Sequence, residues 1–577
     1  MKEPLRRGAI SDEPLRSEGE QQAFFAAALA RSLRAGERAG AVVRDILIAG
    51  SRLRLVFAGN ALVGEFMPAL AHREVPADGA ADLTVHVWDS ESTGVAMVDP
   101  LCRQECLTRR GDIWGMASEL IFSAFHGEEG SVNLLDLESA TGIYWAPTFR
   151  NLPYGTKASP FRSLLYWWLQ RTGIQLLPGT VIGNEIGGVF IAGMAMAGKS
   201  TAVLACLAGG MGVVGENYVA VGLDPIPRAH NHYGAATLND LRQIAPSLPL
   251  RAVLMLCPTN GGAGAREEAV QLSAIAKHDV AASVAFETLT RFPHAGRQTH
   301  GFVERLVELL PVACLALGGD IHNVPAAIAE LLAMSDGALA ALSAASAPRG
   351  PRPLVSVIVP VHNGARFLAE AIATILDQAY PALEIIIIDD GSSDAIDAAV
   401  AGLPVGVRYL KQAQAGASAA RNRGILEATG EVIAFLDVDD LWPRGVLAGL
   451  MDRLARRPDL VVVRGYAQLV VGDGASDGLT YRGSPDESFA DYIGAGIYRR
   501  ESFARIGLFD ETMRFSEDID WFNRARERGL AMERFEQVTL LVRRHGENMT
   551  RGKALLELNT LSTLKRALDR RRAPGGA

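Results

Sequence analysis

Three carboxylates follow a short apolar run in the C-terminal half of the chain. Residues 432–436 read V-I-A-F-L, and Asp437, Asp439 and Asp440 come directly after them. A short continuous apolar run is typical of a strand buried on both faces, and period-2 geometry places Asp437 and Asp439 on one side. Crowded carboxylates repel one another, and a divalent cation that also binds phosphate oxygens relieves this repulsion. The pattern predicts a site for a metal and a phosphate, or else a polar loop that caps the next helix.

The segments around these carboxylates predict a mostly parallel α/β sheet. Alternation of apolar runs and amphipathic stretches favours a helix at 365–378 and strands at 355–361, 384–390, 407–411 and 432–436. Continuous apolar strands that alternate with helices are typical of a parallel sheet between helices. Open α/β sheets bind ligands at the carboxyl ends of their strands. Three of these strands end in polar or acidic residues, so we expect one binding site at that edge.

The composition limits the kinds of protein that this chain can be. It has 577 residues, of which 49% are hydrophobic and 21% charged, and a formal net charge of -8. These values are typical of a globular protein with several domains, and the acidic balance argues against a nucleic-acid-binding protein. The five cysteines are scattered, so we expect reduced thiols. Neither a secretory leader nor an uncharged apolar window of membrane-spanning length is recognisable, so we expect a cytoplasmic protein.

We expect two α/β domains joined by a linker. Alanine and serine dominate from residue 325 to Pro353, and proline and glycine cluster at the end of this stretch, which is typical of an interdomain linker. In the N-terminal part, the patterning predicts helices at 21–35 and 162–172 and strands at 52–57, 83–88 and 188–192. The first domain, the linker, the second domain and a C-terminal helix with a basic tail are expected at 1–335, 336–353, 354–552 and 553–577.

Five motifs in the C-terminal half resemble those of a known family. In chain order they are V-S-V-I-V-P-V-H-N (355–363), I-D-D-G-S-S-D (388–394), A-R-N-R-G (420–424), F-L-D-V-D-D-L-W (435–442) and F-S-E-D-I-D-W (515–521). On these motifs the region resembles the family 2 glycosyltransferases, which have the GT-A fold. The resemblance implies an inverting transfer of a sugar from a nucleotide-sugar donor to a hydroxyl acceptor. It also implies surface polysaccharide or glycoconjugate biosynthesis, with a saccharide or a lipid-linked saccharide as acceptor.

The resemblance assigns a Mg²⁺ or Mn²⁺ ion to the carboxylates after the apolar run. Asp439 is expected to bind the ion directly, Asp437 to lie at the ribose and the metal, and Asp440 to support them. His545 resembles a late histidine of the family near the metal or the diphosphate, and a surface histidine is the alternative. Such an ion neutralises the charge that develops on the departing diphosphate.

The donor nucleotide is expected to contact residues of three motifs. These residues are Pro360, Val361, Asn363, Asp389, Asp390, Arg421 and Asn422. Asp390 resembles the carboxylate that accepts a hydrogen bond from the base, and Asp389 is the less favoured partner. Either aspartate can instead cap the next helix. The guanidinium of Arg421 suits a phosphate, and a surface ion pair is the alternative.

The resemblance assigns the catalytic base to the motif at 515–521. It places Asp518 beside the acceptor hydroxyl and Glu517 next to the substrate. A carboxylate in that position can take the hydroxyl proton while the oxygen attacks the anomeric carbon, and a single displacement inverts that carbon. The alternative is that these acids only begin a helix, where they suit the helix dipole.

A glycine-containing motif lies in the N-terminal half. Residues 193–200 read G-M-A-M-A-G-K-S, which matches G-x-x-x-x-G-K-[ST] between an expected strand and an expected helix. Such P-loops bind nucleotide phosphates through backbone N–H groups and the lysine, and bind Mg²⁺ through the hydroxyl. We therefore expect ATP or a related nucleotide at Gly193, Gly198, Lys199, Ser200 and Thr201. The segment 160–238 resembles HPr kinase-like proteins of carbohydrate loci.

This P-loop segment departs from those relatives at several positions. Ala195 and Ala197 stand where glycines are common, Pro178 stands where a histidine is frequent, and Glu216-Asn217 replaces paired aspartates. The departures weaken the case for phosphotransfer and leave nucleotide binding as the expectation. An alternative function is an ATP-dependent kinase or regulatory protein with an auxiliary transferase domain, and another is a non-enzymatic scaffold. The basic tail at 565–572 suits peripheral contact with anionic lipid, and a solvated helix end is its alternative.

Overall fold

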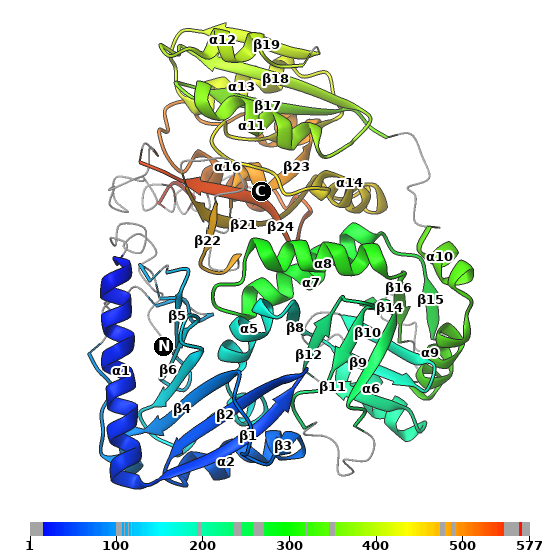
Figure 1. Cartoon of the computed structure of the whole chain (residues 1–577). Coiled ribbons are helices and arrows are strands. Elements are labelled where there is room, and N and C mark those ends of the chain that lie inside the picture. Colours follow the sequence, from blue (N-terminus) through cyan, green and yellow to red (C-terminus); the bar gives the residue numbers. More distant parts are fainter. Residues whose placement is uncertain are drawn as a thin grey trace. The chain divides into compact units, whose positions relative to one another are not determined.

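The computed structural model divides the chain into two compact units, Glu13–Ala347 and Pro348–Ala577. It describes residues 16–99, 107–108, 110–113, 115–116, 118–192, 198–215, 217–234, 244–257, 270–317, 321–344, 352–404, 406–472, 479–485, 491–546, 548, 563, 565–567 and 570. Each unit has its own sheets and its own hydrophobic core. Figure 1 colours the chain from blue at the N-terminus to red at the C-terminus.

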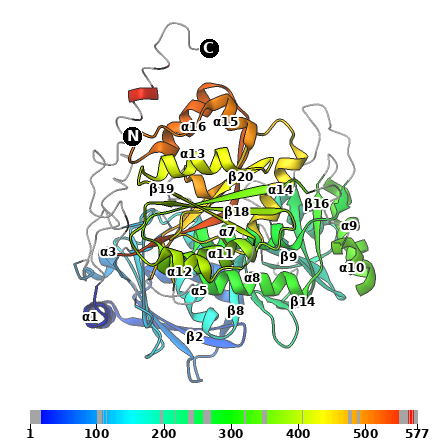
Figure 2. The same ribbon diagram turned by 90° about the horizontal axis from the view of Figure 1, so that it is seen from above.

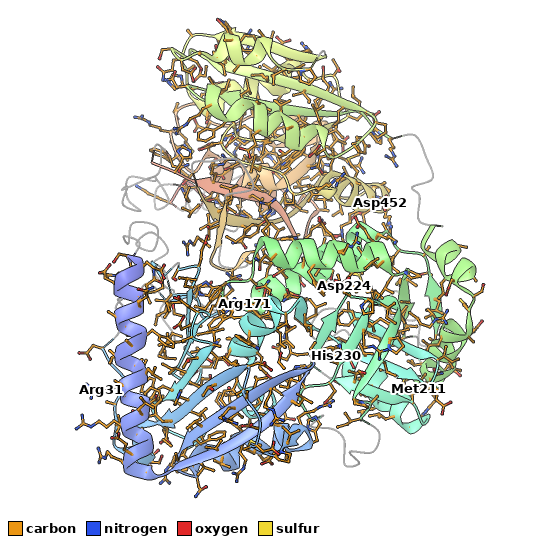
Figure 3. The ribbon with its side chains drawn as sticks, in the orientation of Figure 1. Arg31, Arg171, Met211, Asp224, His230 and Asp452 are labelled. Atoms are coloured by element: carbon orange, nitrogen blue, oxygen red, sulfur yellow. The ribbon has the colours of Figure 1, made fainter. Side chains whose placement is uncertain are left out.

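A long helix, α1 (Glu18–Ala39), packs on the first sheet of the unit Glu13–Ala347. It begins with a capping box, because the Ser17 side chain accepts from the Glu20 N–H while the Glu20 carboxylate accepts from the Ser17 N–H. Phe24 and Phe25 are buried, whereas Arg31 lies on the exposed side (Figure 3). The capping box explains why the helix begins before the expected range.

The first sheet has the strand order β3-β1-β2-β4-β7-β6-β5. Its strands are β1 (Ala41–Ile48), β2 (Ser51–Ala58), β3 (Glu74–Val75), β4 (Leu83–Asp89), β5 (Ile121–His126), β6 (Ser131–Asp136) and β7 (Thr141–Ala146). The helices of this part are α2 (Ala61–Leu70), α3 (Ser90–Thr93), α4 (Tyr154–Ala158) and α5 (Arg162–Arg171). Strands β2 and β4 and helix α5 confirm the ranges that the patterning predicts to within one or two residues.

The second sheet of this unit has the order β11-β9-β10-β14-β13-β12-β8, with β16 beside β14 and β15 beside β16. Its strands are β8 (Ile174–Pro178), β9 (Thr180–Asn184), β10 (Gly187–Ala192), β11 (Gly212–Gly215), β12 (Tyr218–Gly222), β13 (Arg228–His230), β14 (Ser247–Cys257), β15 (Gln271–Ser273) and β16 (Val312–Ala316). The helices are α6 (Lys199–Ala208), α7 (Lys277–Arg291), α8 (Arg297–Leu309), α9 (Val324–Ala333) and α10 (Asp336–Ala344). The centre of the sheet is parallel, since β14 runs parallel to both β10 and β16.

The cysteines differ from the expectation that all of them are reduced. Cys206 is a buried free thiol, but Cys314 on β16 is disulfide-bonded. The expectation is therefore wrong at Cys314, because positions scattered along a sequence do not tell which side chains the sheet brings together.

The unit Pro348–Ala577 contains one eight-stranded sheet with the order β19-β18-β17-β20-β23-β21-β22 and β24 beside β21. Its strands are β17 (Val355–Val361), β18 (Leu383–Asp390), β19 (Val407–Gln412), β20 (Val432–Phe435), β21 (Val462–Val471), β22 (Thr480–Arg482), β23 (Gly496–Arg499) and β24 (Met532–Arg544). The helices are α11 (Ala365–Leu376), α12 (Ile396–Ala401), α13 (Ala417–Glu427), α14 (Val446–Arg456), α15 (Arg500–Ile506) and α16 (Glu517–Glu527), with a 3-10 turn, η8 (Ile493–Ala495).

Helices cover both faces of this sheet. Strands β17, β18, β19 and β20 are mutually parallel, and β23 joins β20 in the antiparallel direction. Figure 2 shows α13 and α16 on one side of the strands and α11 and α12 on the other. Every residue of β17 is buried, as expected for a strand between two helical layers. The expected α/β class with continuous apolar strands is confirmed, and the antiparallel pairings of β23, β21 and β22 make the sheet mixed.

Candidate active site

The parallel strands of the unit Pro348–Ala577 bring three loops to one edge of its sheet. Val361 at the end of β17 pairs with Asp389 near the end of β18, and Ile358 of β17 pairs with Phe435 at the end of β20. The chain leaves all three strands in the same direction. The residues that follow them are therefore neighbours, as the strand pattern predicts.

A buried arginine joins two of the predicted site segments. Arg421 on α13 is 4% exposed, and its guanidinium forms ion pairs with Asp437 at 2.6 Å and with Glu517 at 2.7 Å. Burial alone lowers the pKa of a guanidinium, but the two carboxylates outweigh it and raise the pKa of Arg421. The Arg421 guanidinium thus joins the loop after β20 to the start of α16, although 80 residues separate Asp437 from Glu517.

Asp518 lies in the first turn of α16, next to this ion-pair network. Burial, and then the negative charge of Glu517, raise the pKa of the Asp518 carboxyl to about 8. Ser516 lies two residues before Asp518, at the start of the helix. Its φ of 62° lies in the left-handed region that non-glycine residues rarely adopt. A carboxyl with such a raised pKa is suited to accept a proton near neutral pH.

Asp439 faces the end of β24. Its Oδ2 lies 3.2 Å from His545 Nε2 and 3.2 Å from Asn548 Nδ2. The Asp439 oxygen and the His545 nitrogen are about 3 Å apart, which is the spacing of adjacent ligand atoms around a cation with metal–ligand distances of about 2.1 Å. Within the described part of the chain, no group of three or more His, Cys, Asp or Glu side chains could hold a metal ion. The metal-binding roles expected for Asp439, Asp437 and His545 stay predictions.

Asp440 ties the loop after β20 to β24. It is buried, and its Oδ1 accepts a hydrogen bond of 3.1 Å from the backbone N–H of Arg543. Burial and the neighbouring carboxylates of Asp439 and Asp437 raise the pKa of Asp440. Arg543 is also buried and pairs with Glu370 on α11 at 2.5 Å. These contacts fix the position of Asp440 between the loop and β24, and the supporting role expected for it stays a prediction.

The two aspartates at the end of β18 have different environments. Asp389 accepts from the Ser392 N–H at 2.8 Å and from the Tyr409 hydroxyl at 2.9 Å, so it stabilises the turn after the strand. Burial alone raises the pKa of Asp389, but its hydrogen bonds with Ser392 and Tyr409 outweigh it and lower the pKa. Asp390 is occupied by three donors, Gln412 Nε2 and the N–H groups of Ala415 and Gly416, at 2.7 to 2.8 Å. Each carboxylate oxygen can accept two hydrogen bonds, so Oδ2 of Asp390 keeps one acceptor position.

The end of β17 is joined to the loop after β18 by an asparagine. Pro360 and Val361 are buried in the strand, and Asn363 beyond them has a φ of 54°. The Asn363 Oδ1 accepts hydrogen bonds from the N–H groups of Ser393 at 2.7 Å and Asp394 at 3.3 Å. Asparagine tolerates the left-handed region better than other non-glycine residues, so it holds the two loops at a fixed separation.

Comparison with known proteins bears on this arrangement. Residues 356–503 match the model described as Glycosyl transferase family 2. The C-terminal region contains a family 2 glycosyltransferase domain. The match includes β17 to β20 and β23 but ends before α16.

Relatives of the glycosyltransferase domain include bacterial proteins. An uncharacterized glycosyltransferase of Rickettsia typhi is 29% identical over 231 residues, which cover 37% of this chain and 70% of that protein. The uncharacterized glycosyltransferase EpsJ of Bacillus subtilis is 33% identical over 191 residues, covering 29% and 54%. The putative teichuronic acid biosynthesis glycosyltransferase TuaG of Bacillus subtilis is 33% identical over 143 residues, covering 22% and 56%. The chain thus spans little more than half the length of the latter two relatives.

Two solved structures also align with the chain. One is S. aureus TarS 1-349 in complex with UDP-GlcNAc, at 19% identity and a TM-score of 0.32, covering 38% of this chain and 67% of that one. The other is the mannosyltransferase PcManGT from Pyrobaculum calidifontis in complex with GDP-Man and Mn2+, at 21% identity and a TM-score of 0.30, covering 39% and 66%. Among the described residues, no helix combines the length and apolar character needed to cross a membrane.

Asn422 lies in the interior of the glycosyltransferase domain. Its Nδ2 donates to the Phe509 carbonyl at 3.0 Å and to Glu511 Oε1 at 2.9 Å, while its Oδ1 accepts from the Phe509 N–H at 2.9 Å. These contacts use the amide to join α13 to the segment before α16. Asn548 and Gln412, by contrast, contact site carboxylates and belong to none of the five motifs. Gln412 directly follows an expected strand, and Asn548 lies three residues after His545; these positions are the signals that could have drawn attention to them.

The structure describes part of the segment of the N-terminal unit that is predicted to be a P-loop. Gly193 and the four residues after it lie outside the described residues. Gly198 has a φ of 95° and precedes α6, which begins at Lys199, and Ser200 and Thr201 are exposed. Burial lowers the pKa of the half-buried Lys199, and the nearby Glu287 carboxylate on α7 partly offsets this effect. The expected strand and helix on either side of the motif are present as β10 and α6.

Proposed function

We propose that the glycosyltransferase domain transfers a sugar from a nucleoside diphosphate sugar to an acceptor hydroxyl, with inversion of the anomeric carbon. The observation that carries the proposal is the network in which Arg421 pairs with Asp437 and Glu517, with Asp518 beside it. This network unites a carboxylate loop after a parallel strand with a carboxyl group of raised pKa. A GT-A arrangement of the sheet is part of the same proposal.

The donor nucleotide lies along the carboxyl ends of β17 and β18 in this proposal. Pro360, Val361 and Asn363 border the base, and the remaining acceptor position of Asp390 receives a hydrogen bond from it. Asp437 contacts the ribose and Arg421 lies close to the phosphates. Because the Arg421 charge is divided between two carboxylates, we expect it to position those carboxylates more than to bind phosphate itself.

A divalent cation fits at Asp439 and His545, with Asn548 orienting the Asp439 carboxylate. Two protein ligands suit Mg²⁺ or Mn²⁺, which are commonly bound by one or two side chains together with substrate phosphates. When bound, such an ion neutralises the charge of the departing diphosphate. Asp440 and the Arg543–Glu370 pair hold the Asp439 loop against β24.

The chemical step is a single displacement. The acceptor hydroxyl gives its proton to the Asp518 carboxylate while its oxygen forms a bond to the anomeric carbon. The bond from that carbon to the diphosphate oxygen breaks, and the diphosphate leaves on the opposite face. Attack opposite the leaving group inverts the anomeric centre, by the same geometry as in inverting glycosidases.

The proposal is tested with purified full-length protein and a panel of nucleotide sugars, with released diphosphate as the readout. Asp518→Asn and Asp439→Ala are each expected to lower transfer at least a hundredfold. Asp459→Asn is the matched control, because Asp459 is an exposed aspartate paired with Arg457 on the surface. Full transfer by both site variants would refute the assigned roles. The putative TuaG function and the family match favour polysaccharide biosynthesis as the setting, with a saccharide or lipid-linked saccharide acceptor.

A second candidate function is nucleotide binding by the N-terminal unit. The junction of β10 with α6 at Gly198 and Lys199, beside the parallel strand β14, favours it. Labelled ATP with Mg²⁺ should bind the wild-type chain and not Lys199→Ala. Equal binding by both proteins, or no binding by either, would retire the proposal. Turnover of ATP in the same assay would favour an HPr kinase-like phosphotransfer over binding alone.

A further inference from the structure

Two arginines pair with one aspartate in the glycosyltransferase domain, and a third arginine stands opposite one of them in the sheet. Asp491 pairs with Arg464 at 2.6 Å and accepts two hydrogen bonds from Arg526 at 2.8 and 2.9 Å. Arg534 lies close enough to act on the charge of Arg464. Asp491 pairs with two of the three guanidinium groups, and Arg534 has no carboxylate partner among the described residues, so the cluster carries more positive than negative charge. Burial, and to a lesser degree Arg534 and Arg526, lower the pKa of Arg464, while Asp491 opposes them.

Arg534 is the member of this cluster that is left without a polar partner. Its guanidinium stacks on the Tyr466 ring at 3.7 Å, and among the described residues it forms neither a hydrogen bond nor an ion pair. Its Nε is buried. Arg534 also stands directly opposite Arg464 in the pairing of β24 with β21. Like charges in opposite positions destabilise a sheet, and a buried donor without an acceptor is unfavourable. An anion at this point would relieve both effects.

The cluster lies on the same side of α16 as the proposed base. Asp518, Phe522 and Arg526 recur at intervals of four residues and therefore share one face of the helix. Arg464 lies over the Phe522 ring at 4.7 Å, and Arg526 lies 5.9 Å from the same ring. The helical rise separates the backbone positions of Asp518 and Arg526 by about 12 Å.

The strand register brings the cluster to the level of the carboxylate loop. Val463 of β21 and Ala434 of β20 both pair with Ile497 of β23, so the three residues form one row across the sheet. Arg464 follows Val463 and is thus level with the end of β20, two strands or about 10 Å away. An anion bound by the cluster would lie beyond Asp518 on the side away from the donor carboxylates.

We propose that Arg526 and Arg534, with Arg464 behind them, bind an anionic group of the acceptor, either a phosphate ester or a carboxylate. The inference rests on the proposed function, because it takes Asp518 to mark the acceptor side. Guanidinium groups bind both kinds of oxyanion through paired N–H donors. The acceptor is then a charged glycan or glycosyl phosphate, and the cluster sets its position relative to the Asp518 carboxyl.

Calorimetric titration of the full-length protein tests the proposal with four probes. These are glucose 6-phosphate, methyl glucuronide, neutral methyl glucoside and inorganic phosphate. We expect one of the two charged sugars to bind at least tenfold more tightly than methyl glucoside and more tightly than inorganic phosphate. Which of the two binds identifies the anion. Equal binding of charged and neutral sugars would overturn the proposal, and so would a preference for inorganic phosphate over both charged sugars.

Variants locate the bound probe. Arg534→Gln and Arg526→Gln should each weaken binding of the preferred charged sugar roughly tenfold, and Asp491→Asn should strengthen it, because it removes the competing carboxylate. Arg528→Gln is the matched control: Arg528 is exposed at the end of α16 and outside the cluster. Unchanged affinity in both Arg534→Gln and Arg526→Gln would overturn the assignment. These titrations need no donor sugar, so their outcome does not depend on the diphosphate-release assay that tests sugar transfer.

Discussion

At the scale of single residues, one buried guanidinium organises the candidate active site. Arg421 is 4% exposed and pairs with a carboxylate on each of two segments that are distant in the sequence. A buried ion pair has excellent geometry or it is unfavourable, since desolvation opposes the attraction. Here two carboxylates pair with one guanidinium, so Arg421 does not neutralise both negative charges. The network therefore depends on the geometry of the three groups as well as on their charges.

Replacement of Arg421 tests that role. Arg421→Met should destabilise the glycosyltransferase domain by about 3 kcal/mol or more, because it leaves Glu517 and Asp437 without their partner. The measurement is urea unfolding followed by tryptophan fluorescence. Arg423→Met is the control on the same helix, where the side chain donates to a backbone carbonyl at the surface, and it should cost less than about 1 kcal/mol. Equal unfolding midpoints for Arg421→Met and wild type would contradict the role.

The raised pKa of Asp518 predicts the pH dependence of sugar transfer. The base acts as a carboxylate, and the pKa of this carboxyl is about 8, so kcat/KM should rise about tenfold per pH unit up to about pH 8 and level off above it. Glu517→Gln removes the second cause of the shift, so the inflection should move to lower pH while burial keeps it above the usual aspartate value. An inflection near pH 4 in the wild-type protein would contradict the assignment.

The same pKa predicts how Asp518 affects stability. Because the folded pKa of about 8 lies above the unfolded value of about 4, the folded state binds the proton more tightly. The contribution of Asp518 to stability is therefore largest below pH 4 and decreases as the pH rises from 4 to 8. Asp518→Asn should raise Tm at pH 8.5 by several degrees and change it little at pH 4. A larger gain at pH 4 than at pH 8.5 would refute this sign.

At the scale of elements, α16 begins directly after a serine in the left-handed backbone region, which non-glycine residues rarely adopt. Ser516 precedes the helix with a φ of 62°, and its carbonyl accepts from the Asp520 N–H at 3.1 Å. Strained backbone of this kind is concentrated at functional sites. It turns the chain sharply into the helix that carries Glu517 and Asp518.

Two substitutions at Ser516 separate backbone strain from side-chain loss. Ser516→Gly should remain within about 0.5 kcal/mol of wild type, because glycine adopts this φ without strain. Ser516→Val should destabilise the domain by about 1–2 kcal/mol and lower sugar transfer, because a β-branched residue is disfavoured there. Denaturant midpoints and diphosphate release measure the two effects. Equal stability of both variants would show that the conformation is not strained.

The elements of the glycosyltransferase domain were largely predictable, and the partners of their polar residues were not. Apolar runs gave β17 and β20 to within one residue, because a strand buried on both faces leaves a continuous signal. The pattern also put Asp437 and Asp439 at the end of a strand. It could not tell that the amide of Asn422 is used by Phe509, since that contact joins segments 87 residues apart. Asn548 escaped notice for the same reason, because only the return of β24 brings it to Asp439.

At the scale of the whole molecule, the chain combines two units, each with its own hydrophobic clusters. The cores of the N-terminal unit include Val189 and Val253, and those of the C-terminal unit include Val357 and Ile433. The boundary between the units falls at Ala347 and Pro348, within the stretch whose composition indicates a linker. The predicted domain limits around it stay predictions. Two cores joined by such a stretch are expected to unfold as separate cooperative units.

Calorimetry with two ligands tests both this independence and the two proposed nucleotide sites. We expect two unfolding transitions in the full chain, one for each of the two units. Nucleoside diphosphate with Mn²⁺ should stabilise only the glycosyltransferase domain, by about 2.7 kcal/mol at a hundred times its Kd, and so raise the temperature of its transition. ATP with Mg²⁺ should raise only the temperature of the other transition. Asp439→Ala should abolish the first shift and Lys199→Ala the second, and each variant serves as the control for the other ligand. A single transition that both ligands move together would contradict independent units, because one cooperative core would then carry both sites.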